Sequence, residues 1–181
     1  MKRYFALFLA VILTFSMMGC GKKTEGRSHE GKEKGFFDTK KQEFREGKTL
    51  ADMAQQISNE LEIALPGDLD NTTFEEIVGL KTDEVEEFAG KISMSMESSD
   101  NFIAIKAKED NLDKVKAALE DRLHSVRQSF ESYDSEQYAK AKDGKVITKD
   151  NYAFLIIVGR HGKTPTDEVG RVEQIIETYF E

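Results

Sequence analysis

The sequence is poor in cysteine and proline, and no hydrophobic run in it reaches membrane-spanning length. One cysteine and two prolines occur among 181 residues, and hydrophobic residues make up 39% of the chain. A single cysteine cannot form an intramolecular disulfide framework. This composition also excludes a polytopic membrane protein, a collagen-like chain and a wholly disordered chain. The length is that of about one domain.

Basic charge is scarce in the part of the chain that we expect to fold. The whole sequence has 26 lysines and arginines against 34 aspartates and glutamates, a formal net charge of -8. Residues 49–181 carry 15 basic and 28 acidic side chains, so their net charge is -13. Proteins bind nucleic acid largely by neutralising phosphates with lysine and arginine. We therefore expect no nucleic-acid partner.

The N-terminus has the pattern of an export signal. Lys2 and Arg3 precede an apolar run over residues 4–18 that only Thr14 and Ser16 interrupt. A membrane-spanning helix needs about 20 apolar residues. A run of fifteen residues after a basic start is typical of a signal peptide. We expect residues 1–19 to be this signal.

The signal ends in Ser-Met-Met-Gly-Cys at residues 16–20, and Cys20 is the only thiol of the chain. This ending resembles the lipobox of bacterial lipoproteins. The resemblance implies that Cys20 receives a diacylglyceryl thioether and becomes the first residue after cleavage, with fatty acyl chains such as palmitate in the membrane. The alternatives are an ordinary cleaved signal with an incidental cysteine, or an uncleaved anchor.

A charged linker follows Cys20 up to residue 48. Residues 21–48 contain five glycines, nine basic and six acidic side chains, and little apolar content apart from Phe36, Phe37 and Phe44. Such a composition buries too little surface to offset the entropy of ordering. We expect residues 20–48 to form a lipidated, flexible linker and residues 49–181 to form a single domain.

Helical periodicity predicts four helices in that domain. Thr49 and Asp52 have the spacing of a capping box, and Pro66-Gly67 is a stop signal. Thr82 is expected to cap a short helix that Gly90 ends, and Thr164 with Pro165 to start the last one. The apolar faces that carry these helices lie in residues 50–64, 82–89, 112–133 and 165–180.

Alternating and continuous apolar runs predict four strands, in residues 91–97, 102–108, 145–147 and 152–158. The last of these is apolar throughout, which favours an interior strand covered on both faces. The expected fold is α+β, with a four-stranded, mainly antiparallel sheet and helices packed against it.

From about Thr49 onward the chain resembles a family of lipoproteins from Gram-positive bacteria known as domain of unknown function 4358. The stretches that carry the resemblance, taken in this order, are residues 82–90, 101–108, 130–133 followed by 136–137, and 151–157. Members resemble this chain in having a lipobox and a charged linker. The family brings no known activity, cofactor or catalytic residue.

One turn carries a candidate binding site. The stretch Gly-Arg-His-Gly-Lys-Thr at residues 159–164 follows an expected strand and opens an expected helix. Its two glycines are too close together for a phosphate-binding loop of the G-x-x-x-x-G-K type. A tight solvated turn is the simpler interpretation. The alternative is that Arg160, His161 and Lys163 hold one anion at the helix N-terminus.

We find no catalytic motif, no metal-ligand spacing and no cofactor motif in the sequence. With the thiol assigned to lipidation and no G-x-S-x-G present, no nucleophile stands out. We expect a lipid-anchored protein on the extracytoplasmic face of the cell membrane that binds an envelope protein or a small ligand. A small envelope enzyme and an accessory lipoprotein of a transporter are the alternatives.

Overall fold

The structure, a computed structural model, describes residues 43–181. The expected signal peptide (1–19), the expected lipidation site Cys20 and residues 21–42 of the expected linker lie outside the described residues. Residues 43–48, which we also expected in the linker, are described and contact the domain. Phe44 forms an isolated antiparallel bridge with Phe180.

The described residues contain five α-helices, one 3₁₀-helix and five strands. In chain order these are α1 (Leu50–Leu61), β1 (Pro66–Asp68), α2 (Asn71–Val78), η1 (Thr82–Glu84), β2 (Val85–Ser93), β3 (Asn101–Ala107), α3 (Leu112–Phe130), α4 (Ser135–Asp143), β4 (Lys145–Lys149), β5 (Tyr152–Ile157) and α5 (Pro165–Glu177).

The five strands form one sheet in the order β1-β2-β3-β5-β4, and every neighbouring pair is antiparallel. The α+β class with a mainly antiparallel sheet is confirmed, but the expected number of four strands is wrong. The additional strand is β1, in which Pro66 pairs with Ser93. Proline is tolerated there because β1 is an edge strand. The Pro-Gly pair therefore begins a strand as well as following the end of α1.

The helix expected over residues 82–89 is wrong, because only Thr82–Glu84 is helical and Val85–Ser93 forms β2. Gly90, which we expected to stop that helix, pairs with Ile103 of β3. A Cβ atom at this position would lie 2.8 Å from the carbonyl oxygen of Phe102. The glycine thus permits β2 and β3 to approach each other closely. Pairing with β3 overrides the helical preference of Glu86 and Glu87 in the same strand.

Two further boundaries differ from expectation. The expected helix over residues 112–133 ends at Phe130 and is followed by α4, because Asp134 accepts hydrogen bonds from the backbone N–H groups of Glu136 and Gln137 and caps a new helix. The strand expected over residues 91–97 is wrong after Ser93, where β2 ends. Met94 and Met96 lie in the loop that follows β2, and their side chains are exposed. Helix α2 occupies a segment that we expected to be a connection.

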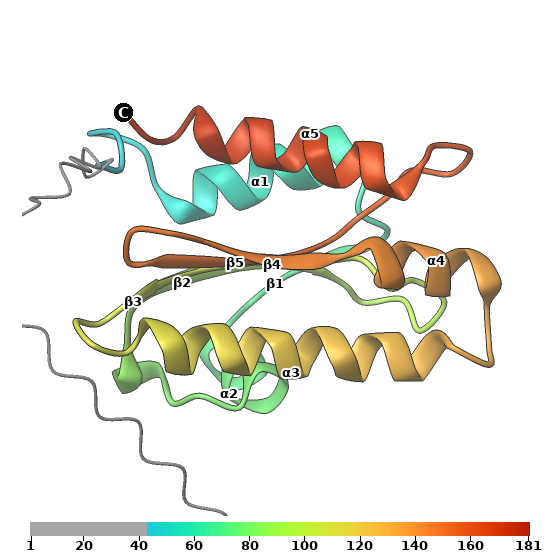
Figure 1. The fold of residues 1–181 in the computed structure, drawn as a ribbon, viewed down its shortest axis with the longest axis horizontal. Helices are drawn as coiled ribbons and strands as arrows, with labels where there is room; N and C mark the ends of the chain where they lie inside the picture. Colours follow the sequence, from blue (N-terminus) through green and yellow to red (C-terminus); the bar gives the residue numbers. More distant parts are fainter. Residues whose placement is uncertain (1–42) are drawn as a thin grey trace, which may run out of the picture. The chain divides into compact units, whose positions relative to one another are not determined.

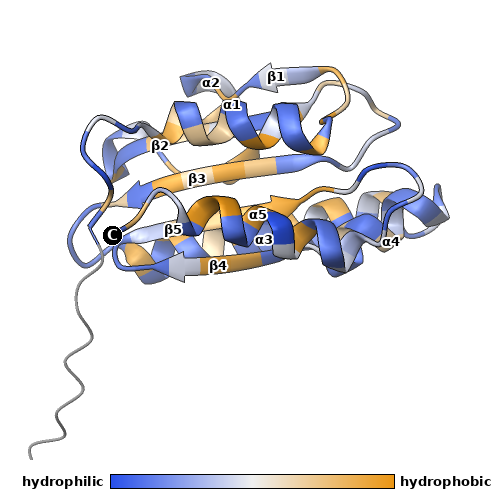
Figure 2. Cartoon of the chain, turned by 90° about the horizontal axis from the view of Figure 1, so that it is seen from above, coloured by the Kyte–Doolittle hydropathy of each residue, from blue (hydrophilic) through white to orange (hydrophobic). Residues whose placement is uncertain are grey.

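Helices cover both faces of the sheet (Figure 1). One buried core lies between the sheet and the face of α2 and α3, and it includes Ile105, Leu119 and Leu155. The other lies between the sheet and the face of α1 and α5, and it includes Ile57, Phe154 and Val172. Figure 2 shows hydrophobic residues along β3 and β5. All six residues of β5 are buried, as expected for an interior strand.

The domain has two ends along β5. At the base, defined by Phe44, Tyr152 and Phe180, three aromatic rings pack with centroids 5.2 to 5.3 Å apart. At the loop end, β5 leaves the sheet after Ile157, opposite the start of β3 at Asn101. Six residues of strand separate the two ends by about 20 Å. The base lies beside the marked C-terminus in Figure 1, and α4 lies at the loop end.

Candidate functional site

A cleft of about 420 Å³ opens at the loop end. Four segments line it, namely the connection after α1, the loop between β2 and β3, helix α4 and the connection between β5 and α5. The lining residues are Glu62, Ala64, Ser95, Glu97, Ser98, Asp100, Glu136, Gln137, Lys140, Gly159, Arg160 and His161. A volume of this size lies within the range of ligand-binding pockets.

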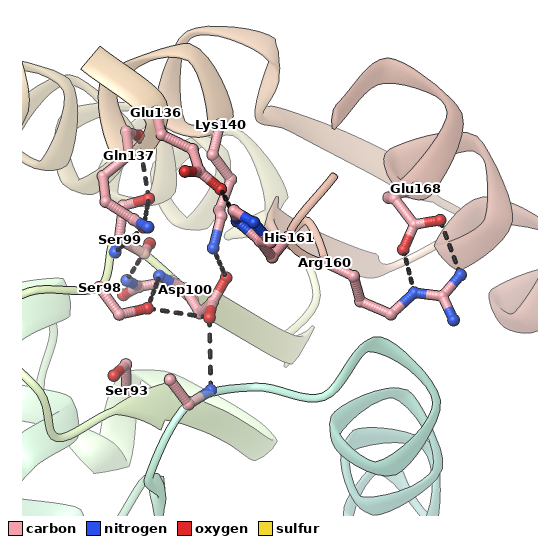
Figure 3. Close-up of polar contacts among 12 residues, drawn as sticks. Ser93, Ser98, Ser99, Asp100, Glu136, Gln137, Lys140, Arg160, His161 and Glu168 are labelled. Atoms are coloured by element: carbon pink, nitrogen blue, oxygen red, sulfur yellow. Dashed lines mark hydrogen bonds and ion pairs between the residues drawn. The ribbon is translucent and has the colours of Figure 1, made fainter. Parts of the chain in front are cut away.

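A buried ion pair forms the floor of the cleft (Figure 3). Lys140 Nζ donates to Asp100 Oδ1 at 2.8 Å, and the two side chains are 8% and 5% exposed. Asp100 Oδ2 also accepts from the Ser98 hydroxyl at 2.9 Å and from the backbone N–H of Ala64 at 3.4 Å. The carboxylate therefore joins α4, the loop between β2 and β3, and the connection after α1.

A second set of hydrogen bonds holds the same loop against α4. The backbone N–H of Ser99 donates to Gln137 Oε1 at 2.9 Å, and the Ser99 hydroxyl donates to the carbonyl oxygen of Gln137 at 3.0 Å. Both contacts appear in Figure 3. Because a buried polar network with all partners present is rigid, the walls of the cleft are preorganised.

The candidate anion-binding turn lies at the edge of this cleft. Arg160 donates to both carboxylate oxygens of the buried Glu168 on α5, at 2.6 and 2.9 Å. His161 Nδ1 lies 3.0 Å from Glu136 Oε1, and both side chains are exposed. Lys163 is exposed, and its backbone N–H donates to the carbonyl oxygen of Arg160. Two of the three side chains thus face carboxylates, and anion binding at this turn stays an untested prediction.

The Arg160–Glu168 pair gives a pH-dependent prediction. The hydrogen bond from Arg160 lowers the pKa of Glu168 from its ordinary value of 4.5. A carboxyl group whose pKa is lower in the folded state adds stability above its unfolded pKa, and this stability is lost as the pH falls through the folded pKa. We expect Glu168→Gln to destabilise the domain at neutral pH. The difference in unfolding free energy from the wild type is expected to shrink as the pH falls below 4.5, the ordinary pKa of a glutamate.

Denaturant unfolding of the wild type and Glu168→Gln across this pH range measures the effect. Glu76→Gln is the matched control, since the Glu76 side chain is exposed and forms no ion pair within residues 43–181. A difference between wild type and Glu168→Gln that stays constant with pH would contradict the prediction.

Exposed apolar side chains lie at the loop end. The large hydrophobic residues that are exposed in the described part are Leu65, Met94, Met96 and Tyr133. The backbone N–H of Met94 donates to the carbonyl oxygen of Leu65 at 3.0 Å. Phe130 connects the other two, because it packs against Tyr133 and shares a pocket with Met96. These four exposed residues thus lie in two pairs, which together are called the apolar rim.

Backbone strain accompanies this rim. Leu65 has a φ of 44° and its side chain is 70% exposed. A residue other than glycine in this region costs about 1–3 kcal/mol and is found disproportionately at binding sites. The strained backbone displays a large apolar side chain to solvent.

The residues at the floor of the cleft were missed by the sequence interpretation. Asp100 lies between two of the expected strands, and Lys140 lies in a stretch of alternating lysine and alanine with no special signal. The two residues are 40 positions apart. Only the tertiary fold brings them together. Within residues 43–181, no group of three or more His, Cys, Asp or Glu side chains is arranged to hold a metal ion.

The chain is thus an α+β protein with helices on both faces of an antiparallel sheet and a polar cleft at one end. A family model described as domain of unknown function (DUF4358) matches residues 59–158. This is more than half of the sequence, so the chain belongs to the DUF4358 family, and the resemblance of its domain is confirmed. Searches among curated proteins and among solved structures gave no match.

The matched range places the floor of the cleft inside the family domain. It runs from the last turn of α1 to the residue after β5 and includes both Asp100 and Lys140. The turn with Arg160, His161 and Lys163 lies beyond it. None of the helices in residues 43–181 has the length and apolar character needed to cross a membrane.

Proposed function

We propose that the chain is a bacterial lipoprotein held on the extracytoplasmic face of the cell membrane by lipid on Cys20, and that its domain is a binding module. The short apolar run after a basic start and the single thiol that follows it support the anchor. The preorganised cleft and the apolar rim at the loop end support binding.

The apolar rim is the observation that carries the binding proposal. Soluble domains bury most large apolar side chains, and an exposed cluster of them marks an interaction site. Leu65, Met94 and Met96 lie on the connections that also form the cleft. The rim offers apolar contact area, and the polar side chains of the cleft beside it offer hydrogen-bond and charge partners.

The charge of the cleft suggests the chemistry of the partner. Glu62 and Glu97 line it and form no ion pair within residues 43–181. The domain as a whole also carries a strong net negative charge. A partner segment with apolar and basic side chains complements this surface. We propose such a segment of an envelope protein as the ligand.

Site-specific cross-linking tests this function. A photoreactive side chain in place of Met96 is expected to give a defined adduct in intact cells. The same side chain in place of the exposed Glu109, near the base, is the matched control and is expected to give none. Equal adducts from both positions, or none from Met96, would contradict a binding site at the loop end.

The charge component is tested in the same cells. Replacing Glu62, Glu97 and Glu136 together with glutamine keeps the side-chain size and removes three negative charges from the cleft. We expect the yield of the Met96 adduct to fall at least about tenfold, as loss of 1.4 kcal/mol or more of interaction would give. An unchanged yield would show that the carboxylates do not select the partner.

A further inference from the structure

A second, smaller cavity of about 240 Å³ adjoins the cleft at the loop end. It lies between helix α3 and the loop that joins β2 to β3. Arg122 lines it from α3, and Ser93 and Ser95 line it from the end of β2 and the loop. Ser95 and Ser98 line both this cavity and the cleft.

Arg122 is a half-buried cation without an anionic partner. Its Nε and Nη2 donate to Asn101 Oδ1 at 3.2 and 3.0 Å. A guanidinium has five N–H donors, so three remain beyond these two contacts. No carboxylate of residues 43–181 forms an ion pair with Arg122. Burial lowers the pKa of the guanidinium.

Two hydroxyl groups of the cavity wall also have donor capacity left. The Ser93 hydroxyl oxygen accepts from the backbone N–H of Ser95 at 3.1 Å, and the Ser95 oxygen accepts from that of Glu97 at 3.2 Å. Neither hydroxyl donates to an acceptor within residues 43–181. The cavity therefore brings together unused donors from one arginine and two serines, which is the arrangement that an oxyanion requires.

Part of the wall is apolar. Met96, Val126 and Phe130 form this part, and the remaining lining residues are the polar Ser98, Ser99, Asn101 and Ser129. The planar fork of a guanidinium matches the two oxygens of a carboxylate, whereas the apolar wall suits a hydrocarbon group. The volume is below the range of about 300–1,000 Å³ for drug-sized ligands, so it fits a small group.

We propose that this cavity is a binding site for the carboxylate of a small organic acid with a short apolar chain. The carboxylate accepts from Arg122 and from the serine hydroxyls, and the chain contacts Met96 and Phe130. An entering anion offsets the cost of burying the arginine charge. The site does not depend on the membrane anchor, and it shares Ser95, Met96 and Ser98 with the surface proposed for the partner.

A purely structural role for Arg122 is the competing explanation. Asn101, which receives its two hydrogen bonds, donates in turn to the carbonyl oxygen of Ser99 at 3.0 Å. Arg122 therefore also braces the loop. A bracing role predicts that Arg122 variants change stability but leave the protein's response to carboxylates unaltered.

Titration of the full chain with butyrate, in non-ionic detergent at constant ionic strength, separates the two explanations. We expect saturable changes in the NMR signals of the Arg122 Nε–H and of the amides of Ser95 and Ser98. Arg122→Met is expected to weaken this binding at least about tenfold, the effect of losing a charge-assisted hydrogen bond. Arg171→Met, which removes an exposed arginine on α5, is the matched control and leaves binding unchanged.

A second variant keeps the test valid if Arg122→Met fails to fold. Ser129→Asp places a carboxylate on the cavity wall at an exposed helix position, and we expect it to prevent butyrate binding without unfolding the domain. Acetate and inorganic phosphate are expected to bind more weakly than butyrate, because neither reaches the apolar wall. Lack of saturation, or tighter binding of phosphate than of butyrate, would overturn the proposal. So would butyrate binding by both Arg122→Met and Ser129→Asp that equals that of the wild type.

Discussion

Lys140→Met is expected to lower the free energy of unfolding by about 3–5 kcal/mol, the usual cost of removing one partner from a buried ion pair. Lys140 Nζ lies 2.8 Å from Asp100 Oδ1, and both side chains are almost fully buried. Without the lysine, the Asp100 carboxylate keeps only the Ser98 hydroxyl and the Ala64 N–H as donors. A charge buried in this way is left uncompensated.

Denaturant unfolding at neutral pH measures this loss. Lys142→Met is the matched control, because Lys142 lies on the same helix with an exposed side chain, and it is expected to change the stability by less than about 0.5 kcal/mol. The double variant Asp100→Asn with Lys140→Met removes both charges and is expected to recover most of the loss. A Lys140→Met variant as stable as Lys142→Met would show that the pair does not hold the loop end together.

Cys20→Ala is expected to move the protein from the membrane fraction to the soluble fraction. Burial of acyl chains contributes about 0.8 kcal/mol per CH₂ group, so two chains of about 15 carbons each contribute on the order of 20 kcal/mol as an upper bound. Loss of the thiol thus removes the proposed anchor completely.

Cell fractionation and metabolic labelling with palmitate measure this effect. The wild type is expected to carry the label and to sediment with membranes, and Cys20→Ala is expected to do neither. Thr24→Ala, four residues further along, is the matched control and keeps both properties. Full membrane retention of Cys20→Ala would support an uncleaved anchor and rule out lipidation as the cause of attachment.

The elements that could be predicted from the sequence have local causes. Thr49 and Asp52 form the expected capping box, with the Asp52 N–H 3.0 Å from Thr49 Oγ1. The apolar run of β5 specified an interior strand, and all its residues are buried. In both cases, neighbouring residues and the immediate surroundings determine the conformation.

The elements that could not be predicted depend on distant contacts. Thr82, the apolar spacing after it and Gly90 predicted a helix over residues 82–89, but most of this segment lies in β2, which pairs with β3 along most of its length. Strand β1 has only three residues and no apolar pattern of its own. A sequence window contains no information about the partner strand that stabilises such segments.

The candidate site could be predicted only in part. Arg160 and His161 were identified from their position after a strand, and both line the cleft. The buried pair below them joins Asp100, from the loop between β2 and β3, to Lys140, from a helix with many charges. Arg122 was one more charged residue on a long helix. The roles of Asp100, Lys140 and Arg122 depend on their burial in the folded domain, which the sequence pattern does not encode.

The chain enters and leaves the described domain at the same place. Glu43 and Glu181 exchange two backbone hydrogen bonds, of 3.1 and 3.0 Å, and Phe44 packs on Phe180. Adjacent termini are what circular permutation requires, so a short link between residues 43 and 181 would allow new termini elsewhere. A fluorescent reporter fused to Glu181 would likewise sit at the base, at the opposite end of β5 from the cleft.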